Sequence, residues 1–266
     1  MNTTIGIQNE ENFVKALDQK TFNEINKNLQ LLLFYLYPNL DKSKKINCYM
    51  TNNFIKPDIV IHQNQQYRYI SLKYGHCETL HNESIMTFVE FLKESNISEE
   101  TIETYLLYHY GDGTTNGTGE KRMSSVETRF TYDDRIKKMN EELNSSKAFI
   151  KKFADRVMFQ GVNSQAERAD YIYHGDPEAG VFISREQFMR HIDRKSWSYM
   201  NRCVHIGPFV VRPHARYAER EILKESHRHT VTVNYPGIVS DLLYIQNRYN
   251  FSHISNNNSV SQMCKL

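Results

Sequence analysis

The sequence predicts a mixed α/β or α+β fold in which helices flank a mixed β-sheet. Apolar residues recur at helical spacing near the N-terminus, two β-rich runs surround a short polar segment, and short strands alternate with helices through the rest of the chain. The 266 residues include 39% hydrophobic and 12% aromatic side chains, which is enough apolar material for a core. This length corresponds to one large domain or two small ones.

The first part of the chain is predicted to combine helices with a β-hairpin. Apolar residues at helical spacing indicate one helix over residues 8–36, and Pro38 follows its end. The polar residues 63–66 suit a hairpin turn. Helix is expected over residues 82–95, and another helix is expected to start at Ser98. The strands in this part are expected at 45–50, 58–61 and 67–73.

Shorter elements are predicted in the remainder of the chain. A glycine-rich loop at 111–119 precedes a long charged helix over residues 132–158. Ser184 and Gln187 match a capping box, which predicts a helix that starts after Ser184. A last helix is expected to end near Tyr249. Strands are expected at 171–174, 181–183, 204–211 and 230–234.

The sequence also argues against several classes of protein. The longest apolar stretch, residues 31–36, is much shorter than the roughly 20 residues of a membrane span. The N-terminus lacks the basic-then-apolar order of a signal peptide. The four cysteines lie far apart without a C-x-x-C pair, which argues against a zinc ribbon or a disulfide scaffold. We therefore expect a soluble cytoplasmic protein.

Charge is spread unevenly, although the net charge is only +2. Residues 185–230 contain ten lysine and arginine residues against five aspartate and glutamate residues. A local basic excess of this kind attracts polyanions such as nucleic acids. An ordinary solvated surface is the alternative interpretation.

Asp58, Ser71 and Lys73 form the constellation that points to chemistry. Ser71 and Lys73 lie two residues apart in one predicted strand, so their side chains share a face. Antiparallel pairing brings Asp58, at the start of the preceding strand, beside them. A carboxylate can bind Mg²⁺, and a lysine can orient water and stabilise charge on a phosphate. The pattern predicts phosphodiester hydrolysis, with a turn aspartate and a solvated strand-end lysine as the alternatives.

This arrangement, residues 57–58 with 71–73, resembles the PD-(D/E)xK nuclease superfamily, which includes most restriction endonucleases. Residues 70–83 are similar to a branch of bacterial restriction-type nucleases that reads S-x-K-x-G. Segments 169–176 and 205–208 are similar to downstream parts of such proteins. The resemblance implies a restriction-endonuclease-like sheet flanked by helices. It also implies a catalytic core over 1–110, the rest of the same fold with DNA recognition over 111–251, and a flexible tail over 252–266.

The resemblance further implies a metal site that departs from the superfamily pattern at Ser71, where an acid is usual. In similar enzymes with serine at this position, the missing carboxylate lies on the following helix. Glu83 is therefore the candidate second ligand beside Asp58. Glu24 is a further candidate metal ligand, because superfamily members often place an acid of the first helix near the metal. The implied cofactor is Mg²⁺.

DNA contacts are expected mainly from the basic region. Its candidate residues, interleaved with aromatic side chains, are Arg185, Arg190, Arg194, Lys195, Arg202, Arg212 and Arg216. His81 is expected to contact a phosphate or a metal-bound water, with capping or packing as the alternative. Cleavage of both strands at a symmetric site favours a homodimer.

We therefore predict a Mg²⁺-dependent endodeoxyribonuclease that cleaves duplex DNA, most closely a type II restriction enzyme. Asp58 and Glu83 are expected to bind the metal. Lys73 is expected to act on the water and the phosphate, with Ser71 supporting the site. The alternatives are a non-catalytic DNA-binding protein on a nuclease-like fold, and a repair or RNA-directed nuclease.

Overall fold

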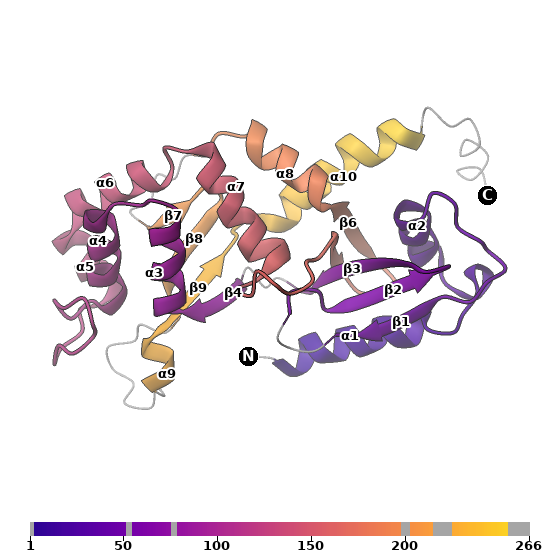
Figure 1. The fold of residues 1–266 in the computed structure, drawn as a ribbon, viewed down its shortest axis with the longest axis horizontal. Helices are drawn as coiled ribbons and strands as arrows, with labels where there is room; N and C mark the ends of the chain where they lie inside the picture. The colour runs from indigo at the N-terminus through magenta and orange to yellow at the C-terminus, as the bar shows by residue number, and fades with distance from the viewer. Residues whose placement is uncertain (1–2, 52–54, 76–78, 198–202, 215–224, 255–266) are drawn as a thin grey trace. The chain divides into compact units, whose positions relative to one another are not determined.

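The structure, a computed structural model, contains two compact units that each have their own β-sheet (Figure 1). It describes residues 3–51, 55–75, 79–197, 203–214 and 225–254. The first unit combines segments 1–77, 158–191 and 237–266, and the second combines 78–157 and 192–236. The mixed α/β class is therefore confirmed. The predicted assignment of catalysis to 1–110 and of recognition to 111–251 stays a prediction.

A five-stranded mixed sheet forms the centre of the first unit. Its strands lie in the order β1, β2, β3, β5 and β6, and the one parallel pair is β3 with β5. The bounds are β1 (Asn47–Met50), β2 (Ile59–Gln63), β3 (Gln66–Lys73), β5 (Tyr171–Gly175) and β6 (Gly180–Ser184). All five correspond to predicted strands, with ends that differ by one or two residues.

The β2–β3 hairpin has a two-residue turn that sets its register. Asn64 and Gln65 both adopt positive φ, 51° and 63°, as a tight hairpin turn with right-handed strand twist requires. Gln63 therefore pairs with Gln66, and the pairing continues to Ile59 with Ile70. A slip by one residue would exchange the two faces of the strand, so this turn determines which side chains reach the core.

The predicted single helix over residues 8–36 is wrong, because the structure contains a break in it. The separate elements are α1 (Thr3–Leu17), the 3₁₀ turn η1 (Phe22–Glu24) and α2 (Lys27–Leu36). Gln19 has a positive φ of 58° after α1, and the Asn26 side chain accepts a hydrogen bond from the Leu29 amide at 2.9 Å to start α2. Apolar spacing continues across the break because both helices pack on the same core.

That core lies on one face of the sheet. Fully buried side chains of α1 and α2, among them Phe13 and Leu29, pack with Ile59, Ile61 and Ile70 of the hairpin. Because side chains alternate along a strand, Asp58, Ser71 and Lys73 belong to the opposite face. Helix α8 (Arg185–Arg194) starts after Ser184, whose Oγ accepts the Gln187 amide at 3.2 Å as the capping pattern predicts, and α10 (Ile238–Ile254) contacts β6.

The second unit contains a four-stranded antiparallel sheet with helices around it. The strand order is β4 (Thr79–Ser84), β9 (Thr230–Asn234), β8 (Phe209–Pro213) and β7 (His205–Ile206). The predicted helix over 82–95 is wrong at its start, because Ser84 ends β4 and caps α3 (Ile85–Glu94). The helix predicted to begin at Ser98 is confirmed as α4 (Glu99–Tyr110).

The long helix predicted over 132–158 is also interrupted. It consists of α6 (Asp133–Leu143), α7 (Lys147–Asp155) and the π-helical turn η2 (Arg156–Gln160). Ser146 starts α7 by accepting the Phe149 amide at 3.3 Å, which explains the interruption. The remaining short helices are α5 (Ser125–Thr131) and α9 (Glu225–Arg228).

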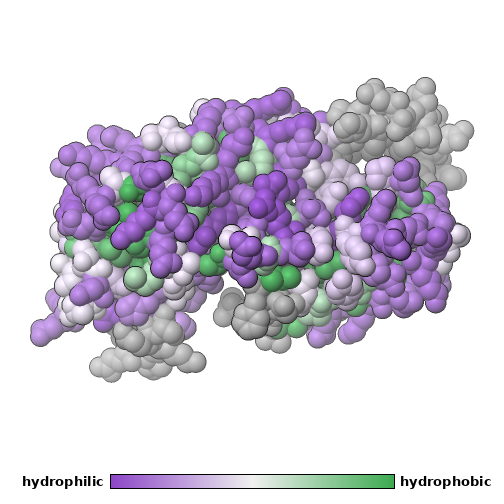
Figure 2. Space-filling view, in the orientation of Figure 1, coloured by the Kyte–Doolittle hydropathy of each residue, from purple (hydrophilic) through white to green (hydrophobic). Residues whose placement is uncertain are grey.

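The surface seen in Figure 2 is largely hydrophilic, with scattered apolar residues. None of the helices in the described part of the chain is long and apolar enough to span a bilayer. Helix α10 runs to Ile254, beyond the predicted end near Tyr249. Most of the predicted tail over 252–266 lies outside the described residues.

Candidate active site

Asp58, Ser71 and Lys73 meet in the first unit, at the open end of the β2–β3 hairpin. The Asp58 amide donates to the Ile70 carbonyl at 2.9 Å, which extends the hairpin register by one residue and sets Asp58 opposite Ser71. The Ser71 hydroxyl donates to Asp58 Oδ2 at 3.1 Å and accepts from Lys73 Nζ at 2.9 Å. Lys73 Nζ lies 3.7 Å from Asp58 Oδ2. The sequence prediction that these three side chains share a face is therefore confirmed.

One oxygen of Asp58 carries all of these contacts. Oδ2 also accepts a hydrogen bond from the Leu72 amide. The other oxygen, Oδ1, accepts no hydrogen bond from any residue that the structure describes. Ser71 is fully buried, whereas the side chains of Asp58 and Lys73 are 24% and 17% exposed. The row formed by Asp58, Ser71 and Lys73 therefore has one carboxylate oxygen fixed by hydrogen bonds, and one accessible carboxylate oxygen beside an ammonium group.

Glu10 of α1 adds a second carboxylate to this row, which the sequence interpretation missed. Burial and the negative charge of Asp58 together raise the pKa of Glu10 to about 7, against the opposing effect of the Lys73 ammonium. The electrostatic coupling places Glu10 near both groups. Its neighbour Asn9 anchors this part of α1 by donating from Nδ2 to the Gly175 carbonyl at 3.1 Å. The sequence alone offers no signal that separates Glu10 from the other acids of the N-terminal helices.

Glu24, the predicted acid of the first helix, makes capping contacts, and its role as a metal ligand stays a prediction. It lies in η1, and its Oε2 accepts hydrogen bonds at 2.7 Å from both the amide and the hydroxyl of Thr21. These two bonds lower the pKa of the exposed Glu24 carboxyl. The prediction for Glu24 depends on residues 8–36 forming one helix. The break in that helix makes Glu24 a capping residue.

Glu83 lies on β4 of the second unit, in a buried ion pair. Its two carboxylate oxygens accept hydrogen bonds from the Arg156 guanidinium, and Oε1 also lies 3.4 Å from His81 Nε2. These hydrogen bonds outweigh burial and hold the pKa of Glu83 below its ordinary value. Arg156 also lies over the Phe91 ring, 4.7 Å from its centroid. The contacts of Glu83 and His81 are those of a buried structural cluster, so their predicted roles toward metal and DNA stay predictions.

His174 of β5 extends the row of polar residues. It pairs with Lys73 in the parallel β3–β5 ladder, and paired residues of neighbouring strands lie on the same face of a sheet. Its side chain therefore stands beside Lys73 on the face that carries Asp58 and Ser71. The sequence interpretation placed 171–174 in a strand but had no means of choosing the strand next to β3.

The predicted DNA-contacting residues fall into both units. Arg190 is exposed and pairs with Glu186 one helical turn earlier on α8. Lys195 lies over the Trp197 ring, with Nζ 4.2 Å from its centroid. Arg185 is half-buried, whereas Arg194 and Arg212 are exposed. Arg202 and Arg216 lie outside the described residues. Their role in DNA binding stays a prediction.

The carboxylates of the row suit a hard divalent cation. Within the described ranges there is no group of three or more His, Cys, Asp or Glu side chains that could hold a metal ion. Mg²⁺ does not need such a group, because it is held in many sites by one or two carboxylates, with water and phosphate oxygens as its other ligands. The negative charge of Asp58 raises the pKa of Glu10, and a cation held beside both groups relieves this repulsion.

The mixed sheet, its flanking helices and the acid–lysine row on adjacent strands define a restriction-endonuclease-like fold. No protein-family model matches the sequence, and no curated protein matches it in sequence. Among solved structures, the fold is similar to that of restriction endonuclease MspI in complex with its cognate DNA. The two structures have a TM-score of 0.51 at 10% sequence identity, over 88% of this chain and 92% of that chain. This likeness supports the fold expected from the motif.

Replacing Glu83 by Gln tests whether its main role is structural. The substitution leaves the Arg156 guanidinium, 13% exposed, without its counter-charge. We expect the free energy of unfolding to fall by about 3–5 kcal/mol in urea denaturation. The exposed pair Arg190–Glu186 is the control, and Glu186→Gln is expected to cost less than about 1 kcal/mol. If Glu83→Gln keeps its stability but loses metal binding, Glu83 is a metal ligand and its main role is not structural.

The raised pKa of Glu10 predicts a pH-dependent loss of stability in metal-free buffer. The pKa of Glu10 is about 7 in the folded protein, whereas the ordinary pKa of a glutamate carboxyl is 4.5. Protonation of Glu10 therefore stabilises the folded state. This contribution is complete at pH values below the pKa of Glu10 in the unfolded chain, and it disappears as the pH rises through the pKa of Glu10 in the folded protein. Urea unfolding at about pH 5 and about pH 8 should show a smaller pH-dependent loss for Glu10→Gln than for the unmodified protein. Identical losses in both proteins would contradict the raised pKa.

Proposed function

We propose that this protein is a Mg²⁺-dependent endodeoxyribonuclease that cleaves duplex DNA, of the type II restriction kind. The observation that carries the proposal is the Asp58–Ser71–Lys73 row, with Glu10 coupled to it, on a restriction-endonuclease-like sheet. An acid and a lysine at this separation can serve the hydrolysis of a phosphodiester. One solved structure with a similar fold, MspI, is in complex with its cognate DNA, which supports duplex DNA as the substrate class.

In the proposed site, Asp58 and Glu10 hold the cation. Asp58 offers Oδ1, the oxygen that takes no hydrogen bond from described residues, while Ser71 and Leu72 fix Oδ2. Glu10 takes the place that the sequence interpretation gave to Glu83 and Glu24. When bound, Mg²⁺ would supply positive charge to the phosphate and lower the pKa of a nearby water.

Lys73 and Ser71 have the other proposed roles in the site. The Lys73 ammonium, held 2.9 Å from both the Ser71 hydroxyl and the Leu72 carbonyl, is oriented to donate a hydrogen bond to the attacking water or to the phosphate. Ser71 stands where the superfamily has an acid, and it connects Asp58 to Lys73 through one hydroxyl. We assign it a positioning role.

Cleavage of both strands at a symmetric site would be served by a two-fold homodimer, which remains part of this proposal. The exposed basic side chains Arg190, Arg194, Lys195 and Arg212 are the proposed phosphate contacts. Such contacts give affinity and register but little sequence discrimination.

Asp58→Ala and Lys73→Ala should each abolish cleavage of phage DNA while DNA binding remains. Asp58→Ala removes a cation ligand, and Lys73→Ala removes the donor to water and phosphate, so losses of about 100-fold or more are expected. Gel assays of cleavage with Mg²⁺, and fluorescence anisotropy for binding, measure the two properties separately.

Lys44→Ala is the matched control, because Lys44 is 59% exposed and pairs only with surface partners. It should cut as the unmodified protein does. Retained cutting by either site variant would remove that residue from the mechanism. Binding without cleavage by the unmodified protein under every divalent cation tried would favour a non-catalytic DNA-binding protein.

Glu10→Gln and Glu24→Gln distinguish the two acids of the N-terminal helices. Glu10→Gln removes a cation ligand and should reduce the cleavage rate by about 100-fold or more, with the defect lessened at high Mg²⁺. Glu24→Gln changes only an exposed cap and should leave the rate within about twofold, with a small loss of stability. Single-turnover cleavage at several Mg²⁺ concentrations makes the measurement. The reverse ranking of the two variants would contradict the assignment of Glu10.

A further inference from the structure

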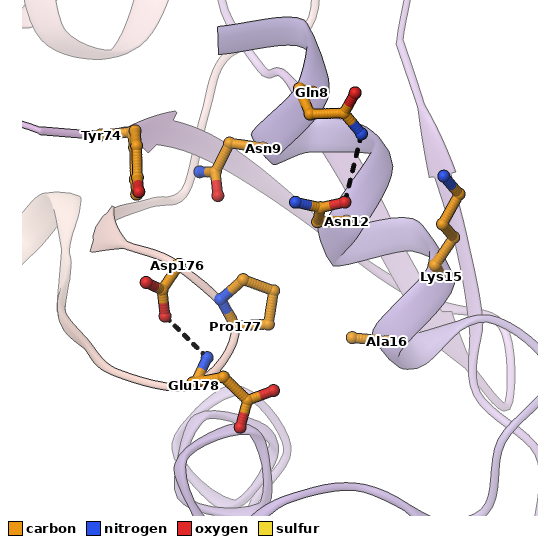
Figure 3. A pocket seen from close by; sticks show the side chains of 9 residues that line it. All are labelled: Gln8, Asn9, Asn12, Lys15, Ala16, Tyr74, Asp176, Pro177 and Glu178. Atoms are coloured by element: carbon orange, nitrogen blue, oxygen red, sulfur yellow. Dashed lines mark hydrogen bonds between the residues drawn. The ribbon is translucent and has the colours of Figure 1, made fainter. Parts of the chain in front are cut away.

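An open cavity of about 670 Å³ lies within the first unit (Figure 3). Its volume falls in the range of roughly 300–1,000 Å³ that is usual for small-ligand sites. One wall is the side of α1, and the other is the turn between β5 and β6. The lining residues are Gln8, Asn9, Asn12, Lys15, Ala16, Tyr74, Asp176, Pro177 and Glu178.

The cavity lies where α/β sheets commonly bind ligands. Strands β3 and β5 are parallel, and Tyr74 and Asp176 lie just beyond their carboxyl ends. The space outside the carboxyl ends of parallel strands is the usual ligand position in such sheets. Tyr74 directly follows Lys73, and Glu10 belongs to the same helix as the α1 wall. The cavity therefore adjoins the end of β3 at which Lys73 lies.

The wall formed by the β5–β6 turn is held rigidly. The Pro177 carbonyl accepts hydrogen bonds from Asn26 Nδ2 at 3.0 Å and Asn28 Nδ2 at 3.1 Å. The Tyr173 hydroxyl donates to the Asp176 carbonyl at 2.6 Å. Gly180 lets the turn close against Tyr173, since a Cβ there would lie 2.3 Å from the ring. A wall fixed by side chains of α2 and β5 is preorganised for recognition.

The opposite wall presents amide groups at regular spacing. Gln8, Asn12 and Lys15 follow one another along one side of α1, at helical positions i, i+4 and i+7. Gln8 Nε2 donates to Asn12 Oδ1 at 3.3 Å, so the two amides are aligned (Figure 3). Each amide retains a hydrogen-bond donor or acceptor for a ligand.

The charge of the cavity argues for a neutral ligand and against a phosphate. The cavity is lined by two carboxylates, Asp176 and Glu178, and by one lysine, Lys15, which already pairs with Glu11. Asp176 Oδ1 accepts the backbone amides of Glu178 and Ala179, both at 2.9 Å, which fixes that carboxylate in the wall. Two carboxylates would repel a phosphate but accept hydrogen bonds from an amine.

The cavity also has aromatic and apolar surface that can contact the faces of a planar ligand. The Tyr74 ring is 43% exposed at one side of the cavity, and Ala16 and Pro177 add apolar surface. An aromatic ring with amide and carboxylate groups around it matches a nucleobase, which has an apolar face and a polar edge. A base that remains stacked in a duplex offers only its edge, so a concave cavity of this kind suits a base that has left the stack.

We propose that this cavity receives one base of the DNA substrate, extruded from the duplex next to the cleaved phosphate. The base carries an exocyclic amine, as adenine and cytosine do. Asn12 and Gln8 pair with its polar edge, Glu178 accepts the exocyclic N–H, and Tyr74 stacks on its face. This inference rests on the proposed nuclease function and adds a recognition site to it.

The test places the fluorescent base 2-aminopurine at each position of a duplex that the protein cuts, and records fluorescence in Ca²⁺ to prevent cleavage. The unmodified protein should raise the fluorescence several-fold at one position only, because an extruded base loses stacking quenching. Tyr74→Ala and Asn12→Ala should abolish that rise and lower kcat/KM for this site about tenfold. Tyr67→Ala is the matched control, because Tyr67 is similarly exposed, at 45%, on β3.

The outcomes separate the two proposals. Cleavage by the unmodified protein without a fluorescence rise at any position, and with both variants cutting at unchanged rates, overturns the base site and leaves the nuclease. A rise that persists in both variants also overturns the assignment to this cavity. If the unmodified protein neither binds nor cuts duplex DNA, the proposed function fails, and the base site fails with it. Thermal unfolding of both variants verifies that a lost rise does not come from a lost fold.

Discussion

The pairing register of the β2–β3 hairpin is the constraint on which the candidate site depends. The two-residue turn at Asn64 and Gln65 aligns the strands so that Asp58 comes opposite Ser71. Shifting either strand by one residue would turn Asp58 or Lys73 toward the apolar core, where an unpaired charge is costly. The buried isoleucines on the opposite face enforce the same alignment. Core packing and site chemistry are thus satisfied by one register, and neither can change without the other.

Hydrogen bonds and opposite charges stabilise the charged groups of the candidate site. One hydroxyl, Ser71, donates to Asp58 and accepts from Lys73, so the row needs no third acid in the strand. The second carboxylate, Glu10, comes from α1, which is anchored to β5 through Asn9. Burial and the charge of Asp58 raise the pKa of Glu10 to about 7. A divalent cation would favour its ionised form, which couples metal binding to deprotonation.

The sequence predicted the elements better than their breaks and contacts. Alternation and turn residues were sufficient for the five strands of the first sheet and for the Asp58–Ser71–Lys73 row, because both follow from local periodicity. Apolar spacing runs through the break near Gln19, since the helices on both sides of it pack on one core. The choice between Glu10, Glu24 and Glu83 depends on tertiary contacts. Local sequence does not encode those contacts.

Anomalous diffraction from crystals containing Mn²⁺, a substitute for Mg²⁺, tests whether Asp58 and Glu10 hold the cation, because it locates the ion without relying on activity. We predict one strong peak within coordination distance, about 2.0–2.3 Å, of a carboxylate oxygen of Asp58 and one of Glu10. A peak on Glu83 without Glu10, or ordered Mn²⁺ that does not touch Asp58, would contradict it.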